Sequence, residues 1–294
     1  AQLGQAGVET QMKRILTFLR QTPGHQTGYA AGNALNLLAT LESDLRGWDF
    51  SGLAIWQADL RGVMLHESDF RQADFSNTVF SDAFSSILSL AYSPDGRRLA
   101  AGITDGTIRI WQTHKGEPLL SWQGQVGFVH SIAFSPNGDL LAGGGDNPKV
   151  FVWDTRNGQP ISGLEGFSGS IFSVAFSPDG NLIAGAGADG IARLWEVAGS
   201  RCIQTFHGHT GPIRSVAFAP DGRTLLTAGQ DHTVVLWDVA DGRRVVTLQG
   251  HTDRVWSVCY SPDGSRAASS AEDGTVRVWD IATSPTEGRC LHVL

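Results

Sequence analysis

A 42-residue internal repeat is the feature that most constrains how this chain of 294 residues can fold. A Ser/Ala-Pro-Asp/Asn-Gly tetrapeptide recurs five times, at 93–96, 135–138, 177–180, 219–222 and 261–264. A tryptophan recurs in the same register, at Trp111, Trp153, Trp195, Trp237 and Trp279. Neither series contains an insertion. Repetition at this period predicts that residues 85–294 build five copies of one supersecondary unit.

Each repeat changes between strand-like and turn-like sequence in a fixed order, as the fourth copy illustrates. Residues 213–218 alternate in the manner of a strand, and the turn 219–222 follows, where Pro presets one φ and Gly supplies a positive one. Further strands are expected at 224–229, at 233–238, which is rich in β-branched residues, and at 244–248. Four short antiparallel strands per repeat predict the blade of a β-propeller.

The repeat resembles the WD40 family, through Trp-Asp at 153–154, 237–238 and 279–280 and Gly-His at 208–209 and 250–251. The resemblance covers residues 87–294 and implies a mainly β fold with blades at 85–127, 128–169, 170–211, 212–253 and 254–294. Because the family usually closes with seven blades, we expect these five to form an incomplete ring, either an open arc or a strained five-bladed ring. The strand edges of an open arc would favour self-association.

The WD40 resemblance also implies a buried hydrogen-bonded tetrad of His, Ser/Thr, Asp and Trp in each blade. The tetrad is complete in the fourth and fifth units, as His209, Thr227, Asp231 and Trp237, and as His251, Ser269, Asp273 and Trp279. A Ser/His/Asp trio can also form a nucleophilic triad. Its recurrence at the repeat spacing favours a structural role here.

The other three units lack parts of the tetrad. The third keeps Asp189 and Trp195, with Phe167 and Gly185 at the other two places. The second keeps only Trp153, with Gln125, Gly143 and Asn147 at the other three places. The first keeps Asp105 and Trp111. Because a satisfied network fixes strand register, the second and third blades are expected to be softer than the fourth and fifth.

A shorter repeat, of five residues, occupies positions 42–84. Its central residues are apolar without interruption: Leu45, Phe50, Ile55, Leu60, Leu65, Phe70, Phe75 and Phe80. A period of five fits neither helix nor strand. The pattern resembles the pentapeptide-repeat family, which implies a square β-solenoid of two stacked coils with Leu and Phe along its axis and Asp and Arg outward. Two coils are too few for the DNA mimicry of longer relatives, and they should need neighbours on both sides. The period breaks at Ala83-Phe84.

Residues 1–41 are predicted to form a pair of helices. The first, over 7–20, carries an apolar stripe of Val8, Met12, Ile15, Leu16 and Leu19, and Pro23-Gly24 ends it. The second covers 29–41, with Leu35, Leu37, Leu38 and Leu41 apolar.

Residues 28–38, together with Ile55-Trp56-Gln57-Ala58, resemble the linker that precedes the WD40 sensor in bacterial signal-transduction ATPases of the STAND class. The resemblance implies an NB-ARC or NACHT-type ATPase module upstream. No GxxxxGK[ST] phosphate loop occurs in the chain, so we do not expect the chain itself to bind ATP. It begins with Ala1 and ends on an apolar strand at 289–294, which suggests a fragment of a longer protein.

Charge and cysteine content limit the classes of partner and the cellular compartment that we expect. The net charge of −7 argues against nucleic acid and anionic membranes as partners. Residues 42–84 hold eight acidic residues against three Arg, so 8 − 3 leaves a net of −5 in that segment. Cys202, Cys259 and Cys290 lack metal-ligand spacing and suggest free thiols in a reducing compartment. No apolar run reaches about 18 residues and no signal peptide is visible. We expect a cytoplasmic location and neither a metal nor a cofactor.

WD40 propellers usually engage partners on the face that carries the loops into the innermost strands. The second residue of each inner strand is Leu88, His130, Phe172, Arg214 or Trp256, and aromatic residues and Arg dominate binding hot spots. His130, Phe172, Arg214 and Trp256 are therefore the candidate partner-binding residues; alternatively, they only seal the central channel. The loop residues before the tetrad Asp positions are Thr104, Asp146, Ala188, Gln230 and Glu272.

These features predict a non-catalytic protein-interaction scaffold, the ligand-sensing and autoinhibitory part of a larger signalling ATPase. One alternative is an enzyme with its active site in the propeller channel, for which no cluster of His, Asp or Glu stands outside the repeat positions. The other is a purely structural spacer.

Overall fold

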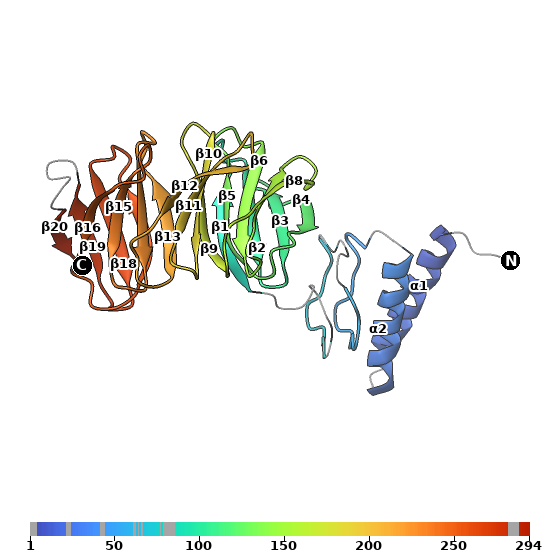
Figure 1. Ribbon diagram of the computed structural model, residues 1–294. Coiled ribbons are helices and arrows are strands. Elements are labelled where there is room, and N and C mark those ends of the chain that lie inside the picture. The colour runs from blue at the N-terminus through green and yellow to red at the C-terminus, as the bar shows by residue number, and fades with distance from the viewer. Residues whose placement is uncertain are drawn as a thin grey trace. The chain divides into compact units, whose positions relative to one another are not determined.

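The computed structural model describes residues 5–21, 25–41, 45–60, 63, 65, 67–76, 78, 86–281 and 288–294. The chain divides into two compact units, which we call the N-terminal unit (Ala1–Ser85) and the repeat unit (Ser86–Leu294). Within the described residues, the first unit contains two helices and the second a series of four-stranded sheets (Figure 1). Each unit is described by itself below.

Two helices, α1 (Gln5–Gln21) and α2 (His25–Thr40), begin the N-terminal unit, and both start before the residues expected from the sequence. On α1, Leu16 is buried and Met12 and Leu19 pack against the same core, whereas Ile15 is exposed and lies off the packed stripe. On α2, Leu35 and Leu38 are buried and Leu37 is exposed. Leu41, which directly follows the helix, is also exposed. Pro23-Gly24 lies outside the described residues.

The pentapeptide segment winds in coils of 20 residues. Parallel bridges pair Asp49 with Asp69 and Ala54 with Asp74, and the rings of Phe50 and Phe70 stack with centroids 5.0 Å apart. Equivalent residues of successive coils therefore lie one above the other, as four pentapeptides per turn require. The central residues of the first coil are buried, those of the second are partly buried, and Phe80 and Ala83-Phe84 lie outside the described residues.

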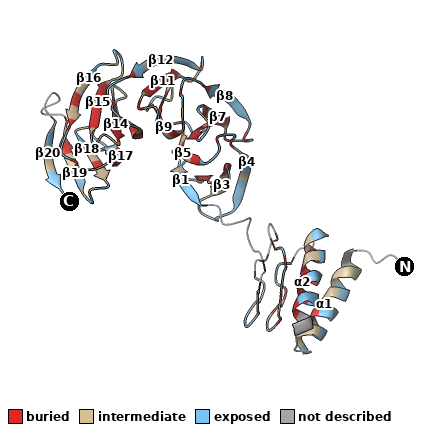
Figure 2. Ribbon diagram, turned by 60° about the horizontal axis from the view of Figure 1, so that its bottom comes forward, coloured by how far each residue is buried: buried red, intermediate tan, exposed pale blue. Residues whose placement is uncertain are grey.

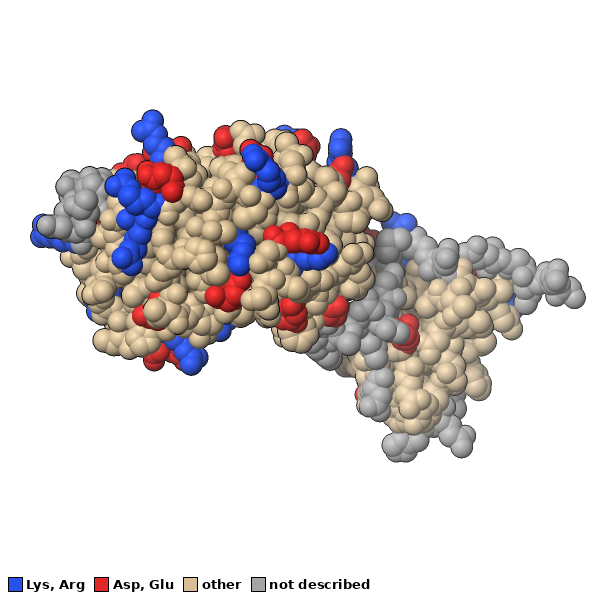
Figure 3. All heavy atoms as spheres, viewed as in Figure 1, with Lys and Arg blue, Asp and Glu red and all other residues tan. Residues whose placement is uncertain are grey.

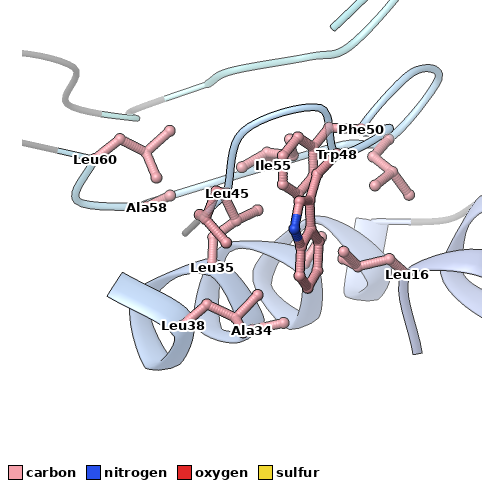
Figure 4. Packing of buried hydrophobic residues seen from close by; sticks show 12 residues of the cluster. Leu16, Ala34, Leu35, Leu38, Leu45, Trp48, Phe50, Ile55, Ala58 and Leu60 are labelled. Atoms are coloured by element: carbon pink, nitrogen blue, oxygen red, sulfur yellow. The ribbon is translucent and has the colours of Figure 1, made fainter. Parts of the chain in front are cut away.

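The helices and the first coil share one core (Figure 4), formed by Leu16, Ala31, Ala34, Leu35, Leu38, Leu45, Trp48, Phe50, Leu53, Ile55, Ala58 and Leu60. The helix pair therefore covers one end of the short solenoid. Two glycines, Gly28 and Gly32, lie one turn apart on α2 and let the chain at Trp56 approach closely. A Cβ atom at either position would collide with Trp56, and the Trp56 backbone N–H donates to the Gly28 carbonyl oxygen at 3.0 Å.

Over residues 86–281 and 288–294, the repeat unit contains five separate sheets, each of four consecutive antiparallel strands. The strands, sheet by sheet, are β1 (Ile87–Tyr92), β2 (Arg98–Ile103), β3 (Thr107–Gln112) and β4 (Pro118–Gln123); β5 (Val129–Phe134), β6 (Leu140–Gly145), β7 (Val150–Asp154) and β8 (Pro160–Leu164); β9 (Ile171–Phe176), β10 (Leu182–Gly187), β11 (Ala192–Glu196) and β12 (Arg201–Phe206); β13 (Ile213–Phe218), β14 (Thr224–Gly229), β15 (Val234–Asp238) and β16 (Arg244–Leu248); and β17 (Val255–Tyr260), β18 (Arg266–Ala271), β19 (Val276–Asp280) and β20 (Arg289–Val293). This arrangement confirms the mainly β fold of five blades.

The recurrent tetrapeptide forms the turn between the first and second strands of each sheet. In the first sheet the buried Ser93 hydroxyl accepts the Arg98 backbone N–H at 2.9 Å and donates to Asp95, whose carboxylate accepts the Arg97 backbone N–H at 3.0 Å. Gly96 has φ +68°, which glycine adopts without steric cost. The serine hydroxyl accepts the equivalent backbone N–H in the second, third and fifth copies, whereas Ala219 of the fourth copy has no hydroxyl.

Neighbouring sheets pack face to face, and a serine on each of the first four inner strands bonds to the next sheet. The Ser89 hydroxyl accepts the backbone N–H of Ile132 at 3.0 Å, and Ser131, Ser173 and Ser215 accept those of Val174, Val216 and Val258 at 3.1, 3.1 and 3.2 Å. Four successive inter-sheet interfaces therefore repeat one pattern of contacts.

The five sheets follow an open arc whose first and last sheets do not meet (Figure 2). Ile87, at the start of the first inner strand, is 55% exposed, whereas its equivalents Val129, Ile171, Ile213 and Val255 are 0% exposed. At the other end of the arc, Val276 of β19 is 39% exposed and its equivalent Val234 is 0% exposed. The ends therefore carry two uncovered faces: the first face (Ile87, Leu90 and Tyr92) and the last face (Ser257, Ser270 and Val276).

Candidate partner-binding surface

Two of the five sheets contain a complete buried tetrad. In the fourth, Trp237 Nε1 donates to Thr227 Oγ1 at 2.8 Å, Thr227 Oγ1 lies 2.7 Å from His209 Nε2, and His209 Nδ1 lies 2.9 Å from Asp231. The His209 side chain is 0% exposed. Burial alone would raise the pKa of Asp231, but hydrogen bonds from His209, Thr210 and Thr233 hold the pKa at about 2.

The fifth sheet repeats this geometry with serine in place of threonine. Trp279 Nε1 donates to Ser269 Oγ at 2.9 Å, which lies 2.8 Å from His251 Nε2, and His251 Nδ1 lies 2.9 Å from Asp273. The Thr275 hydroxyl, with other donors, holds the pKa of Asp273 below its usual range. Both tetrads tie the loop before the inner strand to the second and third strands, so every member has a structural task.

The third sheet replaces the tetrad with a different buried group. Arg193 Nη1 pairs with Asp189 at 2.8 Å, with both side chains at most 10% exposed, and its guanidinium lies over the Phe167 ring at 4.4 Å. Phe167 in turn packs on Trp195. Arg193 thus supplies the partner for Asp189 that a histidine supplies for the Asp of the fourth and fifth sheets. The four tetrad positions alone do not reveal Arg193, but a lone Asp four residues from an apolar-flanked Arg is a signal for this pair.

The second sheet fills the same space with aromatic rings. A Cβ atom at Gly143 would come within 2.6 Å of the Trp153 indole, so the ring occupies the place of the missing hydroxyl side chain. Trp153 packs against Phe151 and Trp122, with both ring centroids at 6.1 Å. Asn147 Nδ2 donates to the Gln125 carbonyl oxygen at 3.1 Å and links the two segments that the histidine would join. In the first sheet the Asp105 carboxylate accepts the Thr107 backbone N–H at 2.8 Å.

The residues predicted to bind a partner form a continuous row along the inner strands of four sheets. The ring centroids of His130 and Phe172 are 5.5 Å apart, and the Arg214 guanidinium carbon lies 4.0 Å from the Phe172 centroid and 5.0 Å from that of Trp256. Phe128, two residues before His130, extends the row with a centroid distance of 6.4 Å. We call Phe128, His130, Phe172, Arg214 and Trp256 the inner-rim row.

Loop residues orient two members of the row. The Asp146 carboxylate lies 3.0 Å from His130 Nε2. With its side-chain oxygen turned toward Arg214, Gln230 accepts hydrogen bonds from Nη2 and, at 2.9 Å, from Nε. In the second and fourth sheets, the loop residues Asp146 and Gln230 therefore hold row residues of their own sheets in place. Thr104, Ala188 and Glu272, in contrast, contact the segments before their inner strands through Ser86, Ser170 and Arg254.

Two residues of this surface were not predicted from the sequence. Phe128, 51% exposed, and Arg254 occupy equivalent positions in their repeats, each two residues before a candidate residue. Because both residues occupy one position of the 42-residue repeat, just before the inner strand, that spacing was the available signal. Leu88, at the equivalent position of the first sheet, is 43% exposed.

Among the described residues, no group of three or more His, Cys, Asp or Glu side chains stands close enough to hold a metal ion. On the face that Figure 3 shows, acidic and basic side chains are interspersed over the repeat unit. No helix in the described part of the chain has the length and apolar character needed to cross a membrane.

Five four-stranded antiparallel sheets along an arc, with one repeated interface between them, define a repeat protein of the β-propeller class. The family described as "WD domain, G-beta repeat" matches residues 76–112, 116–154, 158–196, 200–238 and 242–280, more than half of the chain. The chain therefore belongs to the WD40-repeat family, whose members generally serve as protein-interaction scaffolds. The family "Pentapeptide repeats (8 copies)" matches residues 43–82.

Two relatives are uncharacterized WD repeat-containing proteins of Nostoc sp. One is 47% identical over 115 residues, which is 39% of this chain and 9% of the relative. The other is 37% identical over 119 residues, which is 40% of this chain and 8% of the relative. The aligned segment therefore spans less than a tenth of either relative.

Proposed function

We propose that the inner-rim row is the surface through which this WD40 protein binds a protein partner. The observation that carries the proposal is the continuity of the row across four sheets. Each ring centroid or guanidinium carbon lies 4.0 to 6.4 Å from the ring centroid of its neighbour in the row. Trp256 and Phe128 remain 43% and 51% exposed although each also contacts a row neighbour. Aromatic and arginine side chains that are ordered yet accessible are the usual anchors of protein interfaces.

Alanine at Trp256 tests the surface directly. We expect Trp256→Ala to lose at least tenfold of the affinity for the cognate partner captured by the wild-type chain, because truncating an interface anchor costs about 2 kcal/mol or more. Thermal unfolding should change little, since the indole is 43% exposed.

Ile161→Ala, at an exposed residue on the outer strand β8, is the control and should retain partner binding. Equal loss of affinity in both variants, or unchanged binding by Trp256→Ala, would assign the row to sealing the channel.

We further propose that the chain is the sensing and autoinhibitory part of a larger bacterial signalling ATPase of the STAND class. The resemblance of residues 28–38 and 55–58 to the linker of that class supports the proposal. The great length of the two Nostoc relatives beyond the aligned segment is compatible with additional modules. In such a protein, partner binding at the row would shift the population toward an active state. A cytoplasmic location, inferred from the three cysteines, belongs to the same proposal.

Nucleotide hydrolysis by the full-length protein tests this second proposal. Removal of residues 86–294 is expected to raise basal hydrolysis several-fold, because an inhibitory contact would be lost, and Trp256→Ala should abolish activation by the partner while leaving basal hydrolysis low. A full-length protein without a nucleotide-binding module, or hydrolysis unaffected by the deletion, would contradict it.

A further inference from the structure

The Arg214 guanidinium is held in one orientation before any partner arrives. It lies between the Phe172 and Trp256 rings, on the inner strands of the two adjacent sheets, with its carbon 4.0 and 5.0 Å from their centroids. Gln230 fixes its Nε edge. A planar cation clamped in this way loses little conformational entropy when it binds a ligand, so its remaining donors are preorganised.

The guanidinium still has donors to offer. Of its five N–H groups, two are directed at the Gln230 oxygen, which leaves the two on Nη1 and one on Nη2. Within the ranges that the structure describes, Arg214 has no ion pair with a carboxylate. A half-buried arginine without a counter-charge is unusual, because arginine in proteins commonly pairs with carboxylates.

The charges around Arg214 add to this imbalance. Burial and the positive charge of Arg254 lower the pKa of Arg214, so the charged guanidinium is disfavoured where it stands. Arg254 lies 3.9 Å from Glu272 and has that carboxylate as its own partner. At the other end of the row, His130 already faces Asp146. The excess positive charge of the inner-rim row is therefore concentrated at Arg214.

We propose that Arg214 binds the carboxylate of an Asp or Glu side chain in an extended segment of the partner protein, with an apolar neighbour of that residue on Trp256. The inference rests on the proposed function and names the chemistry of the partner. The free edge of one guanidinium matches one carboxylate, and the exposed indole beside it supplies the apolar contact.

A carboxylate fits better than a phosphate or a nucleic acid. Phosphate groups are typically read by clusters of arginines, and the neighbouring Arg254 is engaged with Glu272. The net charge of −7 repels a polyanion over the whole chain, so an anion must bind here through local contacts.

Selection from a displayed library of random 12-residue peptides tests the inference. We expect the wild-type chain to enrich peptides with Asp or Glu at a fixed position next to an aromatic or aliphatic residue. The best peptide should bind the Arg214→Gln variant at least tenfold more weakly, and Arg214→Lys should recover only part of the loss, because lysine lacks the planar fork.

The matched control is Arg223→Gln, which removes the same charge from an exposed site beyond the other end of β13. It should bind the selected peptide as the wild type does. Synthetic versions of that peptide with Glu, Gln or phosphoserine at the fixed position should bind in the order Glu above phosphoserine above Gln, and the Glu peptide should weaken as salt is raised.

Each of four outcomes would overturn the inference. Neutral or basic consensus peptides, or equal binding of the best peptide by Arg214→Gln, would exclude a carboxylate as the group that Arg214 binds. If Trp256→Ala still loses binding in that case, the row remains an interface. Preference for phosphoserine would assign a phosphopeptide instead. If no peptide is enriched and Trp256→Ala does not affect the cellular partner, the proposed function fails as well.

Discussion

Replacing Thr227 with Val is expected to lower the free energy of unfolding of the fourth sheet by about 2–6 kcal/mol. Valine keeps the shape of threonine but removes the hydroxyl that accepts from Trp237 Nε1 and lies 2.7 Å from His209 Nε2. Both partners are almost completely buried, so water cannot replace the lost bonds. An unsatisfied buried polar group costs about 1–3 kcal/mol, and here two are created.

Hydrogen exchange of the amides in β13–β16, together with urea unfolding, measures this loss. Thr205→Val, on the exposed side of β12, makes the same chemical change outside any network and should shift stability by less than about 0.5 kcal/mol. If Thr227→Val behaved like Thr205→Val, the tetrad would not be a stabilising network. In the fifth sheet, loss of the Ser269 hydroxyl, which accepts from Trp279 Nε1, should have the same effect.

The tetrads also show how far sequence reasoning reaches. A 42-residue period predicts the number of sheets and the order of strands, because each copy must fold in the same way as its neighbours. The third sheet shows a limit of this reasoning. Phe167 and Gly185 predict that the buried hydrogen-bond network is missing there, but the Arg193–Asp189 ion pair takes its place. A buried ion pair depends on which side chains meet across strands, which the four tetrad positions do not encode.

The same distinction applies to the inner-rim row. Equal spacing predicted that His130, Phe172, Arg214 and Trp256 occupy equivalent positions, and adjacent inner strands bring them together. The clamping of Arg214 between two rings, and its lack of a carboxylate partner, depend on rotamers that no spacing predicts. The same holds for two glycines of the N-terminal unit. In the sequence, Gly28 and Gly32 belong only to a stretch that resembles a family linker, whereas the structure shows that their lack of a side chain permits the close approach of Trp56.

The uncovered faces at the two ends of the arc predict head-to-tail self-association of this chain. Each is one half of an interface that occurs four times within the repeat unit. The last face presents Ser257, equivalent to the serines that accept an N–H from the next sheet, and the first face presents Leu90, equivalent to the residues that donate it. Leu90 is 59% exposed, whereas Ile132 and Val258 at the same place are 5% exposed. Because the two faces differ, a second copy leaves one face of each type free, and association continues with concentration.

Light scattering is therefore expected to show a mean mass that rises with concentration for the wild-type chain and stays at that of one chain for Leu90→Asp, since a buried unpaired carboxylate at the joint is costly. Leu119→Asp is the matched control, because Leu119 on β4 is 50% exposed and its equivalent Ile161 is 58% exposed within the arc, outside the inter-sheet contact. Leu119→Asp should associate as the wild type does. A wild-type chain that stays a compact monomer at high concentration would mean that the end faces are covered in solution, and the open arc would then be wrong.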